Sequence, residues 1–507
     1  MINVIEYLEK TAEKYPDKDA FVDEQKSITF RQLRTKSRNL ATVILNATAQ
    51  KINTPIAILM DKSADMLLAF MAITYSANFY TPLDISSPVP SLAKIVEVLR
   101  PKIVITSPKY QGKARELGFS EDMILILEDF IDTEADDTKI AAVLSKKIDT
   151  DPLYTLFTSG STGIPKGVTI CHRSLIDYIE WVCGTFSITS EDSLGNQAPF
   201  YFDNSILDIY SALKTGATLY IIPAKLFISP ARLINYLNEK QINTIFWVPS
   251  ALVYVANTGI LEELTPKYLK RILFCGEVMP NKQLNRWRKA LPEALYANLY
   301  GPTEITDACT YFIVDRPMED NEPLPIGVPC ANTDIIVLND RNELVSGDEH
   351  GELCVRGSSL ALGYYNDPEK TSEAFVQNPL NPFYPELIYR TGDIVKYNER
   401  HELIYLCRKD FQIKHMGHRI ESGEIETAVL ALLEVQNGCI VYDDKENKIV
   451  LFYQAAKNID REIMRELRGQ LPKYMLPNRL IWKESLPMNQ NGKIDCVALK
   501  KSLQQRC

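Results

Sequence analysis

The chain has 507 residues, of which 46% are hydrophobic and 24% are charged, and its formal net charge is -9 at neutral pH. This length exceeds one ordinary hydrophobic core, so it predicts a large part built from several packed subdomains and at least one smaller domain. The acidic balance argues against nucleic-acid binding, because that function needs a basic face to replace phosphate counterions. Composition therefore favours a globular protein without a polyanionic macromolecular partner.

The first residues lack the basic and apolar regions of a signal peptide, and the longest apolar run, around Met66 to Ile73, is too short to cross a bilayer. We therefore expect a cytoplasmic protein with no membrane partner. The ten cysteines contain no C-x-x-C pair, which predicts mostly buried, reduced thiols and neither a disulfide framework nor a zinc site. His415 and His418 form a close pair without a nearby cysteine, so we assign them no metal.

In the first three hundred or so residues, short apolar runs alternate with amphipathic segments. These runs predict strands at 55–60, 103–105, 124–127, 154–157, 218–222 and 244–248. Such alternation is typical of α/β layers with mainly parallel sheets.

From about Cys330 the pattern changes to closely spaced strands and turns, such as 334–338 followed by 339–342, which predicts a β-rich, barrel-like subdomain. Beyond Asp410, residues Ile425, Val429, Leu432 and Leu433 recur at helical spacing and 448–452 is typical of a strand. The expected fold class is therefore α/β, with two α/β subdomains and a β-barrel-like subdomain in 1–405 and a small α+β domain in 406–507.

A loop rich in glycine and hydroxyl groups, Thr-Ser-Gly-Ser-Thr-Gly-Ile-Pro-Lys-Gly at 158–167, follows the strand predicted at 154–157. Glycines let the backbone approach an anion, while hydroxyls and the Lys166 ammonium donate to phosphate oxygens. This is a candidate triphosphate cradle. It differs from a kinase P-loop, because Pro165 intervenes and no Lys-Ser or Lys-Thr step follows the second glycine. A merely flexible loop is the less favoured alternative, since ten matching positions seldom coincide by chance.

This loop resembles the signature of the adenylate-forming superfamily, which includes acyl-CoA ligases, luciferases and the adenylation domains of nonribosomal peptide synthetases. Further motifs of that family follow in order across nearly the whole chain. They are Tyr-Thr-Pro-Leu-Asp at 80–84, Asn-Leu-Tyr-Gly-Pro-Thr-Glu at 298–304, Gly-Glu-Leu-Cys-Val-Arg-Gly at 351–357, Tyr-Arg-Thr-Gly-Asp at 389–393 and Asn-Gly-Lys-Ile-Asp at 491–495.

The resemblance implies that ATP and Mg²⁺ bind where the N-terminal part meets a mobile C-terminal domain. It assigns Asp393 to the ribose hydroxyls, Tyr300 to stacking on adenine and Asn298 to the exocyclic amine. Glu304 would be the magnesium ligand, because a hard carboxylate oxygen suits a hard cation. The nucleotide-binding residues implied are Thr158, Ser159, Gly160, Ser161, Thr162, Gly163, Lys166, Gly276, Glu277, Asn298, Tyr300, Thr303, Asp393 and Arg408.

Lys493 is the catalytic residue that the resemblance implies, because attack of a carboxylate on the α-phosphorus builds negative charge that an ammonium offsets. Asp410 resembles the family hinge, about which the C-terminal domain would rotate to replace Lys493 with the loop at 416–419. Cys407 departs from the family, which commonly has glycine there; this change affects the hinge backbone and not the assignment.

The segment Phe-Tyr-Phe-Asp-Asn-Ser at 200–205 resembles the one that distinguishes activators of α-amino acids, with Asp203 as partner of the substrate ammonium. A buried carboxylate needs such a cation, so this residue argues against fatty-acid and aryl-acid substrates. The alternative is that Asp203 only caps the helix that follows it.

By the same resemblance the substrate pocket is lined by Asn204, Leu207, Trp247, Leu273, Cys275, Leu299, Gly301, Asp307 and Ala308. Trp247 and three leucines imply a small, flat, apolar space, which resembles that of prolyl-adenylating enzymes and favours L-proline. Residues 274–280 instead resemble D-alanine:carrier-protein ligases. Asn204 and Asp307 fit neither pattern, and they leave serine or another small polar amino acid open.

The chain stops fourteen residues after Lys493, without the motif to which phosphopantetheine is attached. We therefore expect the aminoacyl group to pass to the thiol of a separate carrier protein, or of coenzyme A, as in nonribosomal peptide synthesis and related natural-product pathways. An acyl- or aryl-CoA ligase of the same fold and a non-catalytic nucleotide-binding protein are the rival hypotheses.

Overall fold

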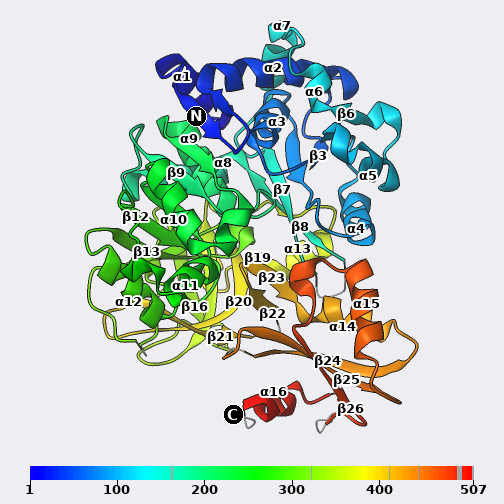
Figure 1. Ribbon diagram of the computed structural model, residues 1–507, viewed down its shortest axis with the longest axis vertical. Helices are drawn as coiled ribbons and strands as arrows, with labels where there is room; N and C mark the ends of the chain where they lie inside the picture. The colour runs from blue at the N-terminus through cyan, green and yellow to red at the C-terminus, as the bar shows by residue number, and fades with distance from the viewer. Residues whose placement is uncertain (161–163, 321, 410–411, 444, 488–493, 505–507) are drawn as a thin grey trace. The chain divides into compact units, whose positions relative to one another are not determined.

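The computed structural model describes residues 1–160, 164–320, 322–409, 412–443, 445–487 and 494–504. The chain forms two compact units (Figure 1). The first unit comprises Met1–Leu83, Arg100–Leu156 and Val168–Lys409, and the second comprises Asp84–Leu99, Phe157–Gly167 and Asp410–Cys507. Among the described residues, every helix is too short or too polar to span a bilayer.

The first unit contains a sheet that is parallel in its middle and antiparallel at both edges. Within the described chain it has nine strands in the order β15 (Val328–Pro329), β14 (Thr310–Ile313), β13 (Leu295–Tyr300), β12 (Arg271–Phe274), β11 (Thr244–Trp247), β9 (Ser193–Asn196), β10 (Thr218–Ile221), β1 (Asp19–Val22) and β2 (Ser27–Thr29). The strands from β1 to β13 in this order pair in parallel, which confirms the expectation of parallel layers.

A second sheet also runs parallel through its centre. Its order is β18 (Gly363–Tyr364), β8 (Lys166–Cys171), β7 (Pro152–Thr158), β4 (Phe79–Pro82), β3 (Pro55–Leu59), β5 (Ile103–Thr106) and β6 (Ile124–Ile126). The strands predicted at 55–60, 103–105, 124–127 and 154–157 are β3, β5, β6 and β7, and those predicted at 218–222 and 244–248 are β10 and β11.

Helices cover these sheets because apolar residues repeat along them at helical spacing. They are α1 (Ile5–Lys14), α2 (Phe30–Ala47), α3 (Ala64–Tyr75), α5 (Gln111–Glu116), α6 (Leu127–Phe130), α7 (Asp137–Leu144), α8 (His172–Thr185), α9 (Asn204–Thr215), α10 (Pro230–Glu239), α11 (Pro249–Asn257), α12 (Asn281–Ala290) and α13 (Pro368–Ala374). A capping box formed by Thr29 and Gln32 begins α2, whereas α3 is buried on nearly every side between its neighbours.

The β-rich part predicted after Cys330 is an antiparallel sheet of the first unit. It has the order β16 (Thr333–Leu338), β17 (Gly351–Gly357), β20 (Leu387–Tyr397) and β19 (Phe375–Gln377), and β21 (Leu403–Arg408) pairs with β20. The long strand β20 carries Asp393 at the position where β21 brings Arg408 opposite to it.

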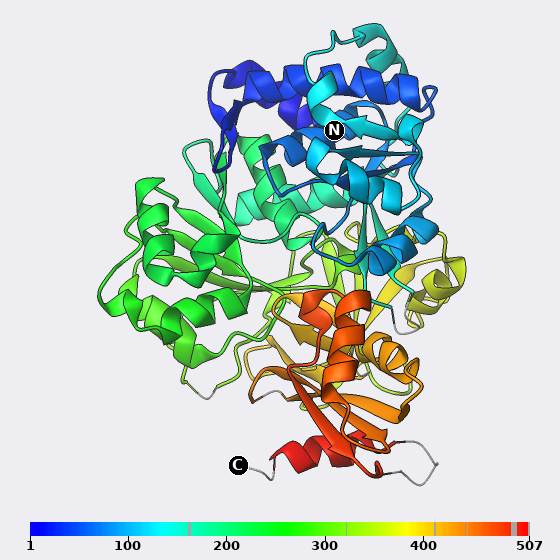
Figure 2. The same cartoon turned by 45° about the vertical axis from the view of Figure 1, so that its right-hand side comes forward.

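The second unit combines α4 (Val89–Leu99), a hairpin of β22 (Gln412–His415) and β23 (His418–Glu421), and a sheet of β24 (Val435–Asp443), β25 (Lys448–Ala455) and β26 (Arg479–Lys483) (Figure 2). Its other helices are α14 (Ser422–Leu430), α15 (Asp460–Gln470) and α16 (Cys496–Gln504). Alternate residues of β24 and β25 face different apolar clusters, because successive side chains of a strand point to opposite faces. Ile440 and Leu451 pack with α14 and α15, whereas Val441 and Phe452 pack with α16.

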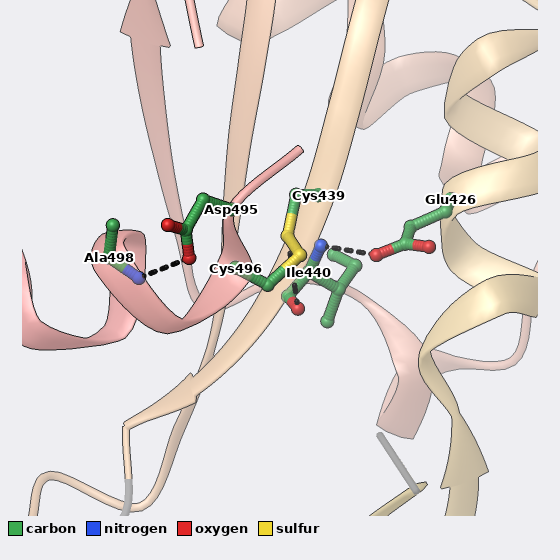
Figure 3. Close-up of a disulfide and its surroundings, with 6 residues drawn as sticks. All are labelled: Glu426, Cys439, Ile440, Asp495, Cys496 and Ala498. Carbon is green, nitrogen blue, oxygen red and sulfur yellow. Dashed lines mark hydrogen bonds between the residues drawn. A yellow bond between two sulfur atoms is a disulfide. The ribbon is translucent and has the colours of Figure 1, made fainter. Parts of the chain in front are cut away.

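A disulfide joins Cys439 of β24 to Cys496 at the start of α16 (Figure 3). The two cysteines are 57 positions apart in sequence, and their Cα atoms are 6.6 Å apart. The prediction of reduced thiols is wrong for this pair, because only the packing of α16 on β24 brings the two residues together. The other cysteines in the described part of the chain are free thiols, and Cys407 is the exposed one.

We predict that replacing Cys496 by serine, or adding a thiol reductant, destabilises the second unit. The bridge closes a loop of 57 positions, and the loss of chain entropy in the unfolded state corresponds to about 4 kcal/mol. Thermal unfolding of the full chain, followed with and without reductant, measures this effect.

Cys407→Ser is the matched control, because it removes an exposed thiol that takes no part in the bridge. This variant should unfold like the wild type in both conditions. Identical unfolding of wild type and Cys496→Ser without reductant would mean that the bridge contributes nothing.

Candidate active site

The loop that follows β7 has the construction of an anion cradle. A Cβ atom at Gly160 would lie 1.9 Å from the Ile164 carbonyl oxygen, so only glycine fits this turn. The Thr158 hydroxyl is buried and has no hydrogen-bond partner among the described residues. A buried hydroxyl without a partner is costly, and a phosphate oxygen would satisfy it. These features fit the triphosphate of ATP. Ser161, Thr162 and Gly163 lie outside the described residues.

Donors of this loop form hydrogen bonds and an ion pair with residues 419–424, which belong to the same unit. The Lys166 ammonium lies 3.1 Å from a carboxylate oxygen of Glu421. Ser159 donates its hydroxyl to the Arg419 carbonyl at 2.7 Å and accepts the Glu421 N–H at 2.8 Å. Burial raises the pKa of Glu424 to about 7, although the Gly160 N–H donates to its carboxylate. An incoming phosphate must therefore compete with carboxylates for the loop.

Three of the predicted nucleotide residues meet in the first unit. Asp393 is 1% exposed, and one of its carboxylate oxygens accepts a hydrogen bond from the Tyr300 hydroxyl. The other oxygen lies 2.9 Å from Nη1 of Arg408, which also donates to the Thr391 carbonyl at 2.9 Å. The guanidinium compensates the buried charge of Asp393, so the carboxylate is held as a fixed acceptor.

The remaining predicted nucleotide residues lie at the ends of neighbouring strands. Asn298 of β13 donates its side-chain amide to the Pro325 carbonyl at 2.8 Å, which leaves its amide oxygen as the acceptor for an exocyclic amine. Gly276 follows β12 with a φ of 100°, a value that glycine adopts without strain. Glu277 accepts the backbone N–H of Ser250 at 2.9 Å.

Glu304, the predicted magnesium ligand, is completely buried and accepts the Tyr364 hydroxyl at 2.7 Å. No group of three or more His, Cys, Asp and Glu side chains in the described chain forms a metal site by itself. Mg²⁺ usually takes one or two carboxylates and completes its shell with water and substrate phosphates. A single buried carboxylate therefore fits this ion.

Asp203 precedes α9, and its carboxylate accepts the Asn204 backbone N–H at 3.1 Å and a hydrogen bond from Thr303. Burial raises the pKa of Asp203, and the Glu304 carboxylate raises it further. Such a carboxylate is costly to ionise until a cation arrives. The capping alternative is also realised by this side chain, so capping and ligand binding are compatible here.

Most of the predicted pocket residues belong to one buried apolar cluster. They are Leu207, Leu273, Cys275, Leu299 and Ala308, and each is at most 1% exposed. Gly301 is required for a different reason, because a Cβ atom there would lie 2.5 Å from the Asp307 carbonyl oxygen. The backbone at Gly301 thus lies very close to the backbone at Asp307.

Trp247 does not join these leucines. In the parallel register of β11 and β12, Phe246 pairs with Leu273 and Trp247 pairs with Phe274. Paired residues share a face of the sheet, so Trp247 faces away from Leu273. Its indole N–H donates to the Gly195 carbonyl at 2.9 Å in a separate core cluster.

Phe246 is the aromatic residue of β11 that shares a face with Leu273, and it is not among the residues predicted from the sequence to line the pocket. It is completely buried and lies in the cluster that contains Leu207, Leu273 and Leu299. The alternation of side chains along a strand could have identified Phe246, because every second residue faces the same side of the sheet. Leu273 and Leu299 lie on one face because Leu273 pairs with Ala297, two residues before Leu299. Counting back from Leu273 to its partner on β11 gives Phe246 and not Trp247.

Asp307 is a second buried carboxylate near Asp203. It is 1% exposed, and Tyr178 of α8 donates its hydroxyl to it. Burial raises the pKa of Asp307 well above its usual range, and the Asp203 carboxylate adds to this rise. Lys493 and Asp410, the predicted catalytic residue and hinge, lie outside the described residues.

Comparison with known proteins identifies the family of this chain. A family described as AMP-binding enzyme matches residues 8–365. A D-alanine--D-alanyl carrier protein ligase of Bacillus licheniformis is 31% identical over 514 residues, which cover 99% of this chain and 100% of the relative. Tyrocidine synthase 1 of Brevibacillus parabrevis is 30% identical, and 98% of this chain matches 45% of that protein, so the chain spans less than half of its length.

Solved structures show the same fold. The adenylation domain AlmE of Vibrio cholerae, in complex with glycyl-adenosine-5'-phosphate, has a TM-score of 0.84 at 23% identity, over 100% of this chain and 98% of that chain. IdnL1 has a TM-score of 0.79 at 26% identity, over 95% and 98%. The family match covers more than half of the chain and the ligase relative is matched along its whole length, so the chain belongs to the family of AMP-binding enzymes.

Proposed function

We propose that this chain activates a small amino acid with ATP and transfers the aminoacyl group to the phosphopantetheine thiol of a separate carrier protein. The observation that carries the proposal is a half-buried carboxylate, Asp203, which no lysine or arginine of the described chain neutralises, beside Thr303 and Glu304. A cationic substrate group completes this arrangement. Fatty and aryl acids supply no such group, so their ligases are the less favoured rivals.

The chemistry has two steps. The substrate carboxylate attacks the α-phosphorus of ATP and expels pyrophosphate, which gives an aminoacyl-adenylate. The carrier thiol then attacks the carbonyl carbon, loses its proton and expels AMP. Asp203 orients the substrate through its ammonium, and Asp393 orients the ribose, so both reactants are positioned before the first bond forms. Mg²⁺ at Glu304 would supply charge neutralisation at the phosphates.

Relatives support the carrier as the acceptor. The D-alanine--D-alanyl carrier protein ligase of Bacillus licheniformis is matched along its whole length. We also propose the two-step mechanism that the family resemblance implies, in which residues 406–507 form a mobile domain hinged at Asp410. Lys493 then serves the first step only.

The residues around the proposed pocket bear on which small amino acid is activated. The preference for L-proline depended on Trp247 as an apolar wall, and Trp247 lies on the other face of the sheet. Phe246 replaces it with another large aromatic ring, so the pocket remains small. D-Alanine gains support from the relatives and from Cys275. Serine gains support from the buried Asp307.

Exchange of labelled pyrophosphate into ATP tests the function directly. We predict that the wild type catalyses exchange with small amino acids and with no fatty or aryl acid. Asp203→Ala should lower exchange with every amino acid about a hundredfold or more, because it leaves the substrate ammonium without its counter-ion. Asp192→Ala is the control, because it removes a buried carboxylate that already forms an ion pair with Arg271. Any loss of exchange activity in this variant should be explained by its lower stability.

Exchange with acyl or aryl acids alone would replace this proposal by an acyl- or aryl-CoA ligase. ATP binding without exchange for any acid would favour a non-catalytic nucleotide-binding protein. Undiminished activity in Asp203→Ala would remove the basis for an amino-acid substrate.

Lys493→Ala should separate the two steps. The loss of an ammonium that offsets developing charge should slow adenylate formation about a hundred- to a thousandfold. Transfer from chemically prepared adenylate to a carrier thiol should fall far less. The two rates are measured by pyrophosphate exchange and by single-turnover transfer, and an equal loss in both would contradict the rotating-domain mechanism.

Phe246→Ala and Trp247→Ala should have different effects on substrate choice. Each removes a completely buried aromatic ring, so each should destabilise the chain by about 3 to 5 kcal/mol. Only Phe246→Ala should widen the pocket and raise the relative exchange rate of larger amino acids. The measurement is the ratio of the exchange rates for leucine and alanine in both variants, well below their unfolding temperatures. A larger change of this ratio in Trp247→Ala than in Phe246→Ala would indicate that Trp247 lines the pocket.

A further inference from the structure

Asp307 places a buried carboxylate beside the half-buried carboxylate of Asp203, which the proposed function uses. Thr306 and Asp307 both have positive φ values, 62° and 71°, a conformation that side-chain-bearing residues adopt at a cost of about 1 to 3 kcal/mol each. Gly301 makes room for this turn, because any side chain there would collide with the Asp307 carbonyl. The fold therefore accepts local strain to carry a carboxylate at this point.

The surroundings of Asp307 provide almost no compensation for its charge. Its neighbours include Tyr178, which donates one neutral hydrogen bond, and the thiol of Cys330. No lysine or arginine of the described chain forms an ion pair with Asp307, and the carboxylates of Asp203 and Asp208 both add to the rise of its pKa that burial causes. A buried carboxylate with a single neutral donor is left with most of its desolvation cost.

Unsatisfied polar atoms near the two carboxylates point to a ligand. Tyr154 is completely buried, its hydroxyl has no hydrogen-bond partner among the described residues, and it interacts electrostatically with both Asp203 and Asp307. The side-chain N–H₂ of Asn204, which is 8% exposed, also has no partner. Each such atom costs about 1 to 3 kcal/mol when it is left unpaired. A polar ligand between the carboxylates would satisfy them.

We propose that the amino acid activated by this chain carries a second ammonium group on a short side chain, and that Asp307 is the carboxylate that receives it. This inference rests on the proposed function, because Asp203 must already hold the α-ammonium. It makes Asp307 a specificity-determining residue and the substrate a short diamino acid, such as 2,3-diaminopropionate or 2,4-diaminobutyrate.

An ammonium fits this place better than a hydroxyl because the two carboxylates repel each other. A zwitterionic substrate such as serine brings one cation, which neutralises Asp203 and leaves Asp307 with neutral donors only. A second ammonium neutralises the second carboxylate and removes the repulsion at the same time.

The side chain must be short because the two carboxylates lie near each other and the apolar residues predicted to line the pocket are buried. Asp203 and Asp307 are near enough for one carboxylate to perturb the other, while Phe246, Leu273 and Leu299 are each at most 1% exposed. Two amino groups of one substrate that reach both carboxylates are thus separated by few bonds. Lysine, whose amino groups are far apart, does not fit this spacing.

Pyrophosphate exchange with the purified full chain tests the inference on matched substrates. 2,3-Diaminopropionate and 2,4-diaminobutyrate are compared with serine, alanine, proline and lysine, as L- and D-forms. We expect kcat/KM to be at least about tenfold higher for one of the short diamino acids than for any of the others.

Asp307→Asn supplies the second readout, because it removes the charge and keeps an acceptor for the Tyr178 hydroxyl. We expect kcat/KM for the diamino acid to fall about a hundredfold, and that for serine and alanine to fall far less, so that the preference disappears. An equal loss for all substrates would assign Asp307 a structural role with Tyr178 and overturn the inference. Thermal unfolding checks that the variant is folded, and the wild-type panel decides the matter if it is not.

The outcomes separate this inference from the proposed function. A wild type that prefers serine, alanine or proline would overturn the inference and leave the function as an amino-acid ligase intact; Asp307 would then be a protonated partner of Tyr178. Exchange with acyl or aryl acids and with no amino acid would overturn the proposed function itself.

Discussion

The hydrogen bond between the Tyr300 hydroxyl and the Asp393 carboxylate connects two sheets of the first unit. Tyr300 ends β13 of the large parallel sheet, and Asp393 lies in β20 of the antiparallel sheet. Arg408 of β21 compensates the same carboxylate from the other side. The three residues therefore connect β13, β20 and β21, the strands that carry the residues we propose to bind adenosine.

Four carboxylates with little exposure to solvent lie at the proposed site of this unit, and they differ in the groups that compensate their charge. Asp393 has a guanidinium and a phenol, so its charge is already compensated and it can act as a fixed acceptor. Glu304 has a hydroxyl from Tyr364, and Asp203 has hydroxyl and amide donors. Asp307 has one phenol. The fewer compensating groups a carboxylate has, the more its ionisation depends on what binds next to it.

The sequence predicts the strands and the motifs well, because apolar runs and ordered motifs are local signals. It assigns Asp203, Leu273, Cys275 and Leu299 to a pocket, and the structure places all of them in the first unit near one buried cluster. It misses Phe246, because choosing between adjacent strand residues requires the register with β12. It also misses the Cys439–Cys496 bridge, because that contact arises from the packing of α16 on β24, which no local pattern encodes.

The pair of Lys166 and Glu421 has a consequence for the nucleotide binding that we propose at this loop. The ammonium is already occupied by an anion of the chain itself, so binding of a phosphate is an exchange of one anion for another. The net electrostatic gain is only the difference between the two pairings. By thermodynamic reciprocity, whatever draws Glu421 away tightens nucleotide binding, and a bound nucleotide frees Glu421 and the β22–β23 hairpin by the same factor. In this proposal the loop couples nucleotide occupancy to the freedom of the hairpin that carries residues 416–419.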